Sequence, residues 1–213
     1  MRRVTFVLLA LCFATTAVEA RGQVTLGLKG GLNISNLSAK DADGSTVDFD
    51  SRTVFTGGAY LQAGLGSVLA LQAEALYSPR GANDDGGASL DLTYFDLPLL
   101  VLIRVPAGDS AIWPILYAGP VLSFETKCRL NSDEGSSVDC GSGDDVLFRT
   151  KNTDVGVTFG GGFEVFMGSY TLQLDGRYNL GLVDIDDTTD GAVGSLKNRT
   201  WSFYIGLGRV LSP

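Results

Sequence analysis

The sequence contains no histidine, and it has only three cysteines among its 213 residues. Without histidine, a Ser-His-Asp triad, histidine-assisted acyl transfer and histidine-ligated zinc are all excluded. Past residue 20, no stretch approaches the roughly 18 to 20 apolar residues that a membrane-spanning helix needs. If the chain lies in a bilayer, it must therefore cross it as strands, and these must close into a barrel so that no edge is left unpaired.

Basic residues are also scarce, with 16 Lys and Arg against 24 Asp and Glu. A nucleic-acid backbone is bound through a basic surface, so we do not expect nucleic acid as a partner. The acidic excess could indicate a preference for cations. Solvated loops are the interpretation that we favour.

The first 20 residues have the pattern of an export signal. Residues 1–3 form a basic start, 4–18 is a nearly uncharged apolar run, and Val18-Glu19-Ala20 has small residues at the two positions that signal peptidase recognises. We predict cleavage after residue 20, which removes 20 of the 213 residues and leaves 193. That length is typical of one domain, which we predict over 21–213.

Cleavage at this position would leave two cysteines, Cys128 and Cys140, in an acidic and glycine-rich stretch. An even number of cysteines in an exported chain indicates a disulfide that closes a short loop. If the two are bonded to each other, neither provides a thiolate nucleophile.

Alternation of apolar and polar residues with a period of two runs through the remaining chain. Over 24–34, the even positions are mainly apolar and the odd positions mainly polar. Alternation over about ten residues is typical of a transmembrane strand, whereas strands of soluble proteins usually have about five or six residues. Eight segments of this kind are predicted, at 24–34, 53–65, 69–77, 90–105, 112–124, 154–166, 172–180 and 201–207. The predicted fold class is all-β, a closed antiparallel up-and-down transmembrane β-barrel of about eight strands.

The connections between these segments alternate between long and short. The long ones are predicted at 36–52, 79–89, 125–152 and 183–197, and the short ones at 65–67, 106–110 and 167–169. Outer-membrane barrels have short periplasmic turns and long external loops. The predicted location is therefore the outer membrane of a Gram-negative type of cell.

Four segments in series resemble the outer membrane protein β-barrel domain family, whose members are often labelled porin-family or PorT-type proteins. The segments are YFDLPLL (94–100), PILYAGP (114–120), GGGFE (160–164) and RYNLGL (177–182). The resemblance covers nearly all of the chain after residue 20. It implies a small outer-membrane barrel with outer-membrane lipid and the barrel-assembly machinery as partners, and it brings no established catalytic residues.

Eight charged residues fall on the face that we predict to point into the lumen. They are Lys29, Glu74, Asp96, Arg104, Asp154, Glu164, Asp175 and Arg177. The interior of an eight-stranded barrel is only wide enough for side chains to fill. We therefore interpret three cations facing five acids as a hydrogen-bonded plug, in preference to the lining of an open channel.

Two further groups of residues have a possible role. The acidic run Asp184, Asp186, Asp187 and Asp190 could bind calcium, but it lacks the spacing of an EF-hand, so a solvated loop is favoured. Aromatic residues near the predicted strand ends are interpreted as interfacial girdles. They are Tyr77, Trp113, Tyr117, Phe124, Tyr170 and Trp201.

The sequence therefore predicts an integral outer-membrane protein with a structural or surface-interaction role and a plugged polar lumen. We expect no enzymatic activity, no cofactor and no metal, and the surface partner stays open. One alternative is a channel for small solutes. The other is a soluble carrier similar to a lipocalin, in which the apolar side chains would face the inside of the barrel.

Overall fold

The computed structural model describes residues 23–41, 46–48, 50–83, 89–131, 137–139, 153–182 and 193–212. These residues form ten strands in one sheet. The strands are β1 (Val24–Asp41), β2 (Thr46–Asp48), β3 (Asp50–Gly64), β4 (Leu69–Asn83), β5 (Ser89–Arg104), β6 (Ile112–Asn131), β7 (Ser137–Asp139), β8 (Thr153–Met167), β9 (Tyr170–Gly181) and β10 (Val193–Ser212). Across these ranges, no helix is long and apolar enough to cross a membrane.

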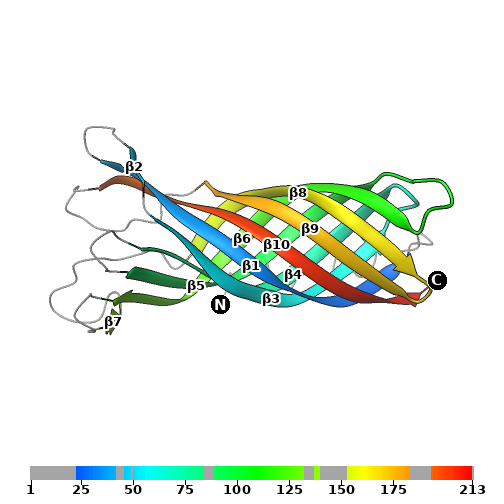
Figure 1. Ribbon diagram of the computed structural model, residues 1–213, viewed down its shortest axis with the longest axis horizontal. Coiled ribbons are helices and arrows are strands. Elements are labelled where there is room, and N and C mark those ends of the chain that lie inside the picture. The colour runs from blue at the N-terminus through cyan, green and yellow to red at the C-terminus, as the bar shows by residue number, and fades with distance from the viewer. Residues whose placement is uncertain are drawn as a thin grey trace, which may run out of the picture.

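Eight of the strands close into an antiparallel barrel, as the alternation predicts. Their order is β10-β9-β8-β6-β5-β4-β3-β1, and β10 pairs back onto β1. This closing pair runs from Val24↔Ser212 to Asp41↔Val193, so the barrel is sealed along the full length of both strands. The short strands β2 and β7 pair only with β1 and β6, and they lie at one end of the barrel (Figure 1).

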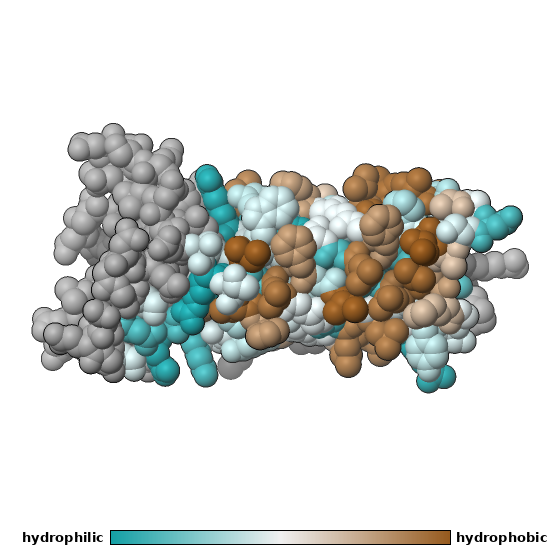
Figure 2. All heavy atoms as spheres, in the orientation of Figure 1, coloured by the Kyte–Doolittle hydropathy of each residue, from teal (hydrophilic) through white to brown (hydrophobic). Residues whose placement is uncertain are grey.

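Side chains alternate across the barrel wall. In β8, Asp154 and Thr158 are buried inside, while Val157 and Phe159 are exposed on the outside. Exposure of large apolar side chains reaches 82 % at Phe55. Such side chains cover much of the outer wall in Figure 2, between hydrophilic residues toward the two ends. Outward apolar and inward charged residues suit a lipid environment, and they are the reverse of what the lipocalin-like alternative requires.

The short connections lie at one end of the barrel and the long ones at the other. β3 and β4 are joined by 65–68, β5 and β6 by 105–111, and β8 and β9 by 168–169. Gly168 adopts a φ of 64°, a left-handed conformation that suits glycine in a two-residue hairpin turn. The predicted positions of the short turns are thus confirmed to within a few residues. We call the two ends of the barrel the turn side and the loop side.

The predicted strand ends are wrong on the loop side, where the strands run further than the apolar pattern does. β4 continues to Asn83 and β6 to Asn131, inside the predicted long connections 79–89 and 125–152. Beyond the lipid the outer face no longer needs apolar residues, so the alternation fades while backbone pairing continues. Pro79 is a second reason why the end of β4 was predicted too early. It lacks an N–H, and it lies where the β3–β4 ladder is interrupted between Ser51 and Gly57.

Three predictions fall on residues outside the described ranges. These are the signal peptide over 1–20, the position of Cys140 and the acidic run Asp184, Asp186, Asp187 and Asp190. Cys128 lies near the loop-side end of β6. The signal peptide, the Cys128–Cys140 disulfide and the solvated acidic loop therefore stay predictions.

Candidate functional site

The barrel lumen holds the charged residues that form the candidate site. All eight residues predicted to face the lumen are buried, with exposures from 1 % at Arg177 to 7 % at Arg104. A ninth buried charge, Arg80, was missed. The nine come from β1, β4, β5, β8 and β9, so they surround the lumen rather than line one wall.

The centre of the site is Glu74 on β4, which binds two cations from other strands. Lys29 Nζ on β1 donates to Glu74 Oε1 at 2.9 Å. The Arg177 guanidinium on β9 donates from Nη1 to Oε2 at 2.7 Å and from Nη2 to Oε1 at 3.1 Å. The two parallel bonds make a bidentate pair, which fixes both groups in orientation. These contacts join strands on opposite sides of the barrel.

Asp175 on β9 receives the remaining donors of the same centre. It accepts from Lys29 Nζ at 3.2 Å and from Arg177 Nη2 at 3.2 Å. The Tyr117 hydroxyl donates to Asp175 Oδ1 at 2.5 Å. The Tyr204 ring lies 4.5 Å from Arg177 Cζ and 5.0 Å from Lys29 Nζ, which adds cation–π contacts to both.

A second arm extends toward the turn side through two glutamines. Arg104 Nε donates to Glu164 Oε2 at 2.6 Å, and Arg104 Nη2 donates to Gln62 Oε1 at 2.7 Å. Gln62 Nε2 donates to Glu164 Oε1 at 2.6 Å and to Gln72 Oε1 at 3.1 Å. Gln72 Nε2 then donates to Glu74 Oε1 at 2.5 Å. We call the connected set the turn-side network. It consists of Lys29, Gln62, Gln72, Glu74, Arg104, Glu164, Asp175 and Arg177.

The turn-side network is balanced in charge, and all of its carboxylate oxygens are satisfied, whereas Arg177 Nε has no hydrogen-bond partner among the described residues. Its three cations face three carboxylates, and each of the six carboxylate oxygens accepts at least one bond. Buried charges that are paired and hydrogen-bonded in this way restrict one another's orientation. The arrangement can therefore hold opposite walls of the barrel together and fill the lumen between them.

Asp96 and Asp154 are not part of this network. The Arg80 guanidinium on β4 donates to Asp96 on β5, and it lies 4.9 Å from the centre of the Tyr94 ring. Asp154 on β8 also acts electrostatically on Arg80. We call Arg80, Asp96 and Asp154 the loop-side cluster. The predicted set of eight thus divides into six residues in one network and two in another.

The alternation in the sequence places Arg80 on the lumen face, although Arg80 was not among the predicted site residues. The lumen-facing positions of β4 are Gln72, Glu74, Leu76, Ser78 and Arg80, which continue the period of two past the predicted end of the strand at Tyr77. Gln62 and Gln72 also lie on the polar face of their segments, but uncharged residues were not counted as site candidates.

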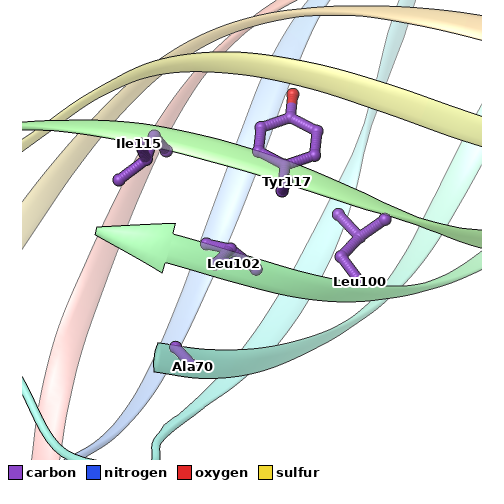
Figure 3. Packing of buried hydrophobic residues seen from close by; sticks show 5 residues of the cluster. All are labelled: Ala70, Leu100, Leu102, Ile115 and Tyr117. Carbon is purple, nitrogen blue, oxygen red and sulfur yellow. The ribbon is translucent and has the colours of Figure 1, made fainter. Parts of the chain in front are cut away.

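Part of the lumen wall is apolar, which the sequence analysis missed as well. Ala70, Leu100, Leu102, Ile115 and Tyr117 form a buried cluster on β4, β5 and β6 (Figure 3). The signal was the run LLVLI at 99–103, in which both faces are apolar. These side chains lie on the lumen face of β4 and β5 together with Gln72, Glu74 and Arg104 of the turn-side network, so apolar and charged groups share this part of the wall.

Two predicted girdle residues, Tyr117 and Trp113, are wrong. Tyr117 is buried in the lumen, because its position in β6 falls on the same face as Ile115 and Val121. Trp113 has the same alternation in β6 and is half-buried against Phe166, whose ring lies 6.0 Å from Cζ of the lumen residue Arg104. The other four candidates, Tyr77, Phe124, Tyr170 and Trp201, are exposed on the outer side. Within the described ranges, no group of three or more Asp, Glu or Cys side chains is arranged to hold a metal ion.

The chain belongs to the outer membrane protein β-barrel domain family, whose model matches residues 4–208. This membership places the barrel in the outer membrane. It agrees with the resemblance drawn from the four sequence segments. Comparison with curated proteins gives no match.

Several solved outer-membrane proteins have a similar fold. The outer membrane protein OprG from Pseudomonas aeruginosa is 13 % identical with a TM-score of 0.54, covering 90 % of this chain and 98 % of OprG. The outer membrane protein AlkL, solved in DMPC lipid bilayers, is 13 % identical with a TM-score of 0.54, covering 93 % and 94 %. Neisserial surface protein A is 12 % identical with a TM-score of 0.51, covering 88 % and 97 %. At these identities the likeness establishes the fold alone.

Proposed function

We propose that the protein is a membrane-anchored scaffold that presents its loop side at the cell surface, with a lumen closed by the turn-side network. The observation that carries this proposal is the network itself. Lys29, Glu74 and Arg177 come from β1, β4 and β9, and they meet across the lumen without a carboxylate oxygen left over. This arrangement supports a lumen without a continuous path for solutes, because the interior of an eight-stranded barrel is only wide enough for side chains to fill.

Several finer features belong to the same proposal. Export by cleavage after residue 20, a Cys128–Cys140 disulfide and folding by the barrel-assembly machinery are expected of an outer-membrane barrel of this kind. We also propose that the chain catalyses no reaction. This is supported by the absence of histidine from the sequence and by the engagement of the turn-side carboxylates with cations of the same network.

Conductance in planar bilayers tests whether the lumen is closed. We expect the wild-type barrel to give no discrete openings. The variant Glu74→Ala removes the carboxylate at the centre of the network, and we expect it to give openings. Asp109→Asn, in the exposed turn after β5, changes a carboxylate outside the lumen and should stay silent. Discrete openings of the wild type would instead support the alternative of a small-solute channel.

Cysteine labelling on intact cells tests which end faces outward. Ser137→Cys places a thiol on β7 at the loop side, and Asp109→Cys places one in an exposed turn at the other end. Because outer-membrane barrels have their long connections outside, a membrane-impermeant maleimide should label the first variant and spare the second. The opposite result would overturn the surface-presenting role.

A further inference from the structure

The outer face of β10 carries two exposed arginines, Arg199 toward its loop-side end and Arg209 close to its turn-side end. β10 crosses the front of the barrel in Figure 1, where apolar side chains gather in Figure 2. Every second side chain between the two arginines is apolar and points away from the lumen, with exposures of 51 % to 56 %. These side chains are Trp201, Phe203, Ile205 and Leu207. The arginines therefore bracket a stretch of wall that faces hydrocarbon.

The spacing of the two arginines matches the thickness of that hydrocarbon. They are ten positions apart in β10, and an antiparallel strand rises about 3.4 Å per residue, which gives about 34 Å along the strand. Strands of outer-membrane barrels are tilted by about 35–45°, so the separation along the membrane normal is about 24–28 Å. The apolar band of such barrels is about 25 Å tall. One arginine thus lies at each boundary of the membrane, where an outward charge costs little.

The strands beside β10 supply no counter-charge for these two arginines. Their partners across both ladders are uncharged: Leu180 and Asn36 for Arg199, and Tyr170 and Leu26 for Arg209. Within the described ranges, neither guanidinium forms an ion pair, whereas the arginines of the turn-side network do. A guanidinium binds phosphate and carboxylate oxygens with pairs of N–H bonds. An anion for Arg199 and Arg209 therefore has to come from outside the protein.

Aromatic side chains place both arginines at the level of the lipid headgroups. Trp201 lies two residues from Arg199 on the same face, and its ring is 5.0 Å from the ring of Tyr178, which is 5.7 Å from that of Phe159. The three rings form a row across the outer face of β10, β9 and β8. At the other end of the wall, Tyr170 is the direct neighbour of the second arginine. Tyrosine and tryptophan at the edge of an apolar band lie at the membrane–water interface.

We propose that Arg199 and Arg209 each bind the headgroup phosphate of a negatively charged membrane lipid, one lipid in each leaflet. The guanidinium donates to the phosphate oxygens, and the acyl chains of the same lipid lie along the apolar residues of the wall. The occupant is a lipid because both positions are continuous with the lipid-facing surface. The attraction is local, since the chain as a whole carries a net charge of −8. Two such contacts would fix the height of β10 in the membrane.

Quenching of tryptophan fluorescence by brominated lipids tests the loop-side contact. In the Trp113→Phe background, Trp201 is the only tryptophan. Brominated phosphatidylglycerol, which is anionic, and brominated phosphatidylcholine, which is zwitterionic, are compared at equal mole fractions in phosphatidylcholine bilayers. A basic residue at an anionic lipid surface raises the local affinity about fivefold, so we expect enrichment of this order beside Trp201. Arg199→Gln should abolish the enrichment, and Arg199→Lys should keep most of it.

Arg209→Gln is the matched control for Trp201, because it removes the same charge at the opposite boundary, and the enrichment should be unchanged. The turn-side contact has its own reporter. Tyr170→Trp, in a background that also carries Trp113→Phe and Trp201→Phe, places the only tryptophan beside Arg209. There, Arg209→Gln should abolish the enrichment and Arg199→Gln should leave it unchanged. Equal quenching by the two brominated lipids at either reporter would overturn the contact at that boundary.

A measurement without arginine variants keeps the test independent of their folding. In about 1 M NaCl the Debye length is about 3 Å, so the preference for phosphatidylglycerol at Trp201 should fall strongly. A preference that persists at this salt concentration would overturn the electrostatic contact. Lipids brominated at successive positions of the acyl chain report depth, and Trp201 should be quenched most by bromines close to the headgroup. Strongest quenching from the bilayer centre would overturn the bracketing of the membrane by the two arginines. Neither contact depends on a closed lumen, so discrete openings of the wild-type barrel would leave this proposal in place.

Discussion

On the turn side of the lumen, three cations face three carboxylates, and each of the six carboxylate oxygens accepts a hydrogen bond. On the loop side, Arg80 donates to Asp96 Oδ2, and Asp96 Oδ1 has no hydrogen-bond partner among the described residues. Both halves lie inside the same eight strands, so the barrel does not dictate this difference. It comes from which side chains fill the two layers.

The difference assigns separate roles to the two halves. The turn-side network joins β1, β3, β4, β5, β8 and β9 through bonds between buried groups, and such a network resists rearrangement. The loop side is held by the Arg80–Asp96 pair and by hydrogen bonds such as those of Asn33, so fewer ion pairs between buried groups join separate strands among the described residues. We therefore expect the turn side to contribute more to the stability of the barrel than the loop side does. The following predictions test this division.

The largest effect is expected from Glu74→Ala. The substitution leaves Lys29 and Arg177 buried without the carboxylate that both of them bind, and breaking a buried pair in this way costs about 3–5 kcal/mol. The free energy of unfolding in urea, followed by fluorescence of the two tryptophans in detergent micelles, measures it.

The matched substitution on the loop side is Asp96→Ala. It removes one partner of Arg80 and leaves the charge of Asp154 nearby, so the loss of stability should be clearly smaller. If Asp96→Ala destabilised the barrel as much as Glu74→Ala does, the two halves would not differ in the way proposed.

A smaller effect is expected from Gly162→Ala on the turn side. A Cβ at this position would lie 1.9 Å from the Leu174 carbonyl oxygen and 2.7 Å from the Asp175 Cα, so β9 has to move where it carries the network. Overpacking of this kind costs about 1–3 kcal/mol, and contact with backbone puts it at the upper end. The gel mobility of unboiled samples and the urea midpoint measure the loss.

The control is Gly156→Ala, on the same strand but on the loop side. Its nearest contact would be the Leu180 carbonyl oxygen at 2.7 Å, followed by Val121 Cγ1 at 3.2 Å, and the second of these can yield. We expect a loss of stability well below that of Gly162→Ala. The reverse order would mean that the turn side is no more tightly packed than the loop side.

The closed barrel could be predicted from sequence, because lipid imposes an apolar residue at every second position of a strand. The strands of 24–41 and 153–167 show this clearly, and the positions of Lys29 and Glu164 on the lumen face follow from the same period. Beyond the lipid this constraint ends. That is why the predicted strands stopped early and why Arg80, three residues past the predicted end of its strand, was assigned to a loop.

The pairing of the charges could not be predicted, because it depends on the stagger between strands. Lys29 and Asp175 are 146 residues apart in sequence, and they meet only because closure of the barrel brings β1 and β9 to the same level. The lumen position of Tyr117 was available from its alternation with Ile115. Because its aromatic ring lies near a strand end, Tyr117 was instead predicted to be part of a girdle. Proximity to a strand end is a weaker indication of the side that a residue faces than the two-residue alternation of the strand.

Tyr117→Phe is expected to have a moderate effect. It removes the hydroxyl that donates to Asp175 Oδ1 at 2.5 Å and keeps the ring in place. A hydrogen bond to a charged acceptor contributes about 1.5–3 kcal/mol, and the lower end applies because Asp175 still binds Lys29 and Arg177.

Ser78→Ala, which removes a neutral acceptor of Asn33 on the loop side, should cost less, about 0.5–1.5 kcal/mol. Urea unfolding of the two variants side by side would contradict the division if Ser78→Ala were the more damaging.

The smallest effect is expected for the ion pair of Arg52 and Asp91, at the loop-side ends of β3 and β5. The Arg52 and Asp91 side chains are 29 % and 34 % exposed, so water screens the attraction between them. The Arg177 and Glu74 side chains are almost fully buried, so their attraction is screened much less. A double-mutant cycle with Arg52→Ala and Asp91→Ala should give a coupling energy below about 1 kcal/mol, and it should fall further in 1 M salt. The same cycle for Arg177 and Glu74 should give a larger coupling that salt barely changes, because both groups are buried. Burial of a charge and completeness of its hydrogen bonds would then set its contribution to this barrel, whereas the mere presence of an opposite charge would not.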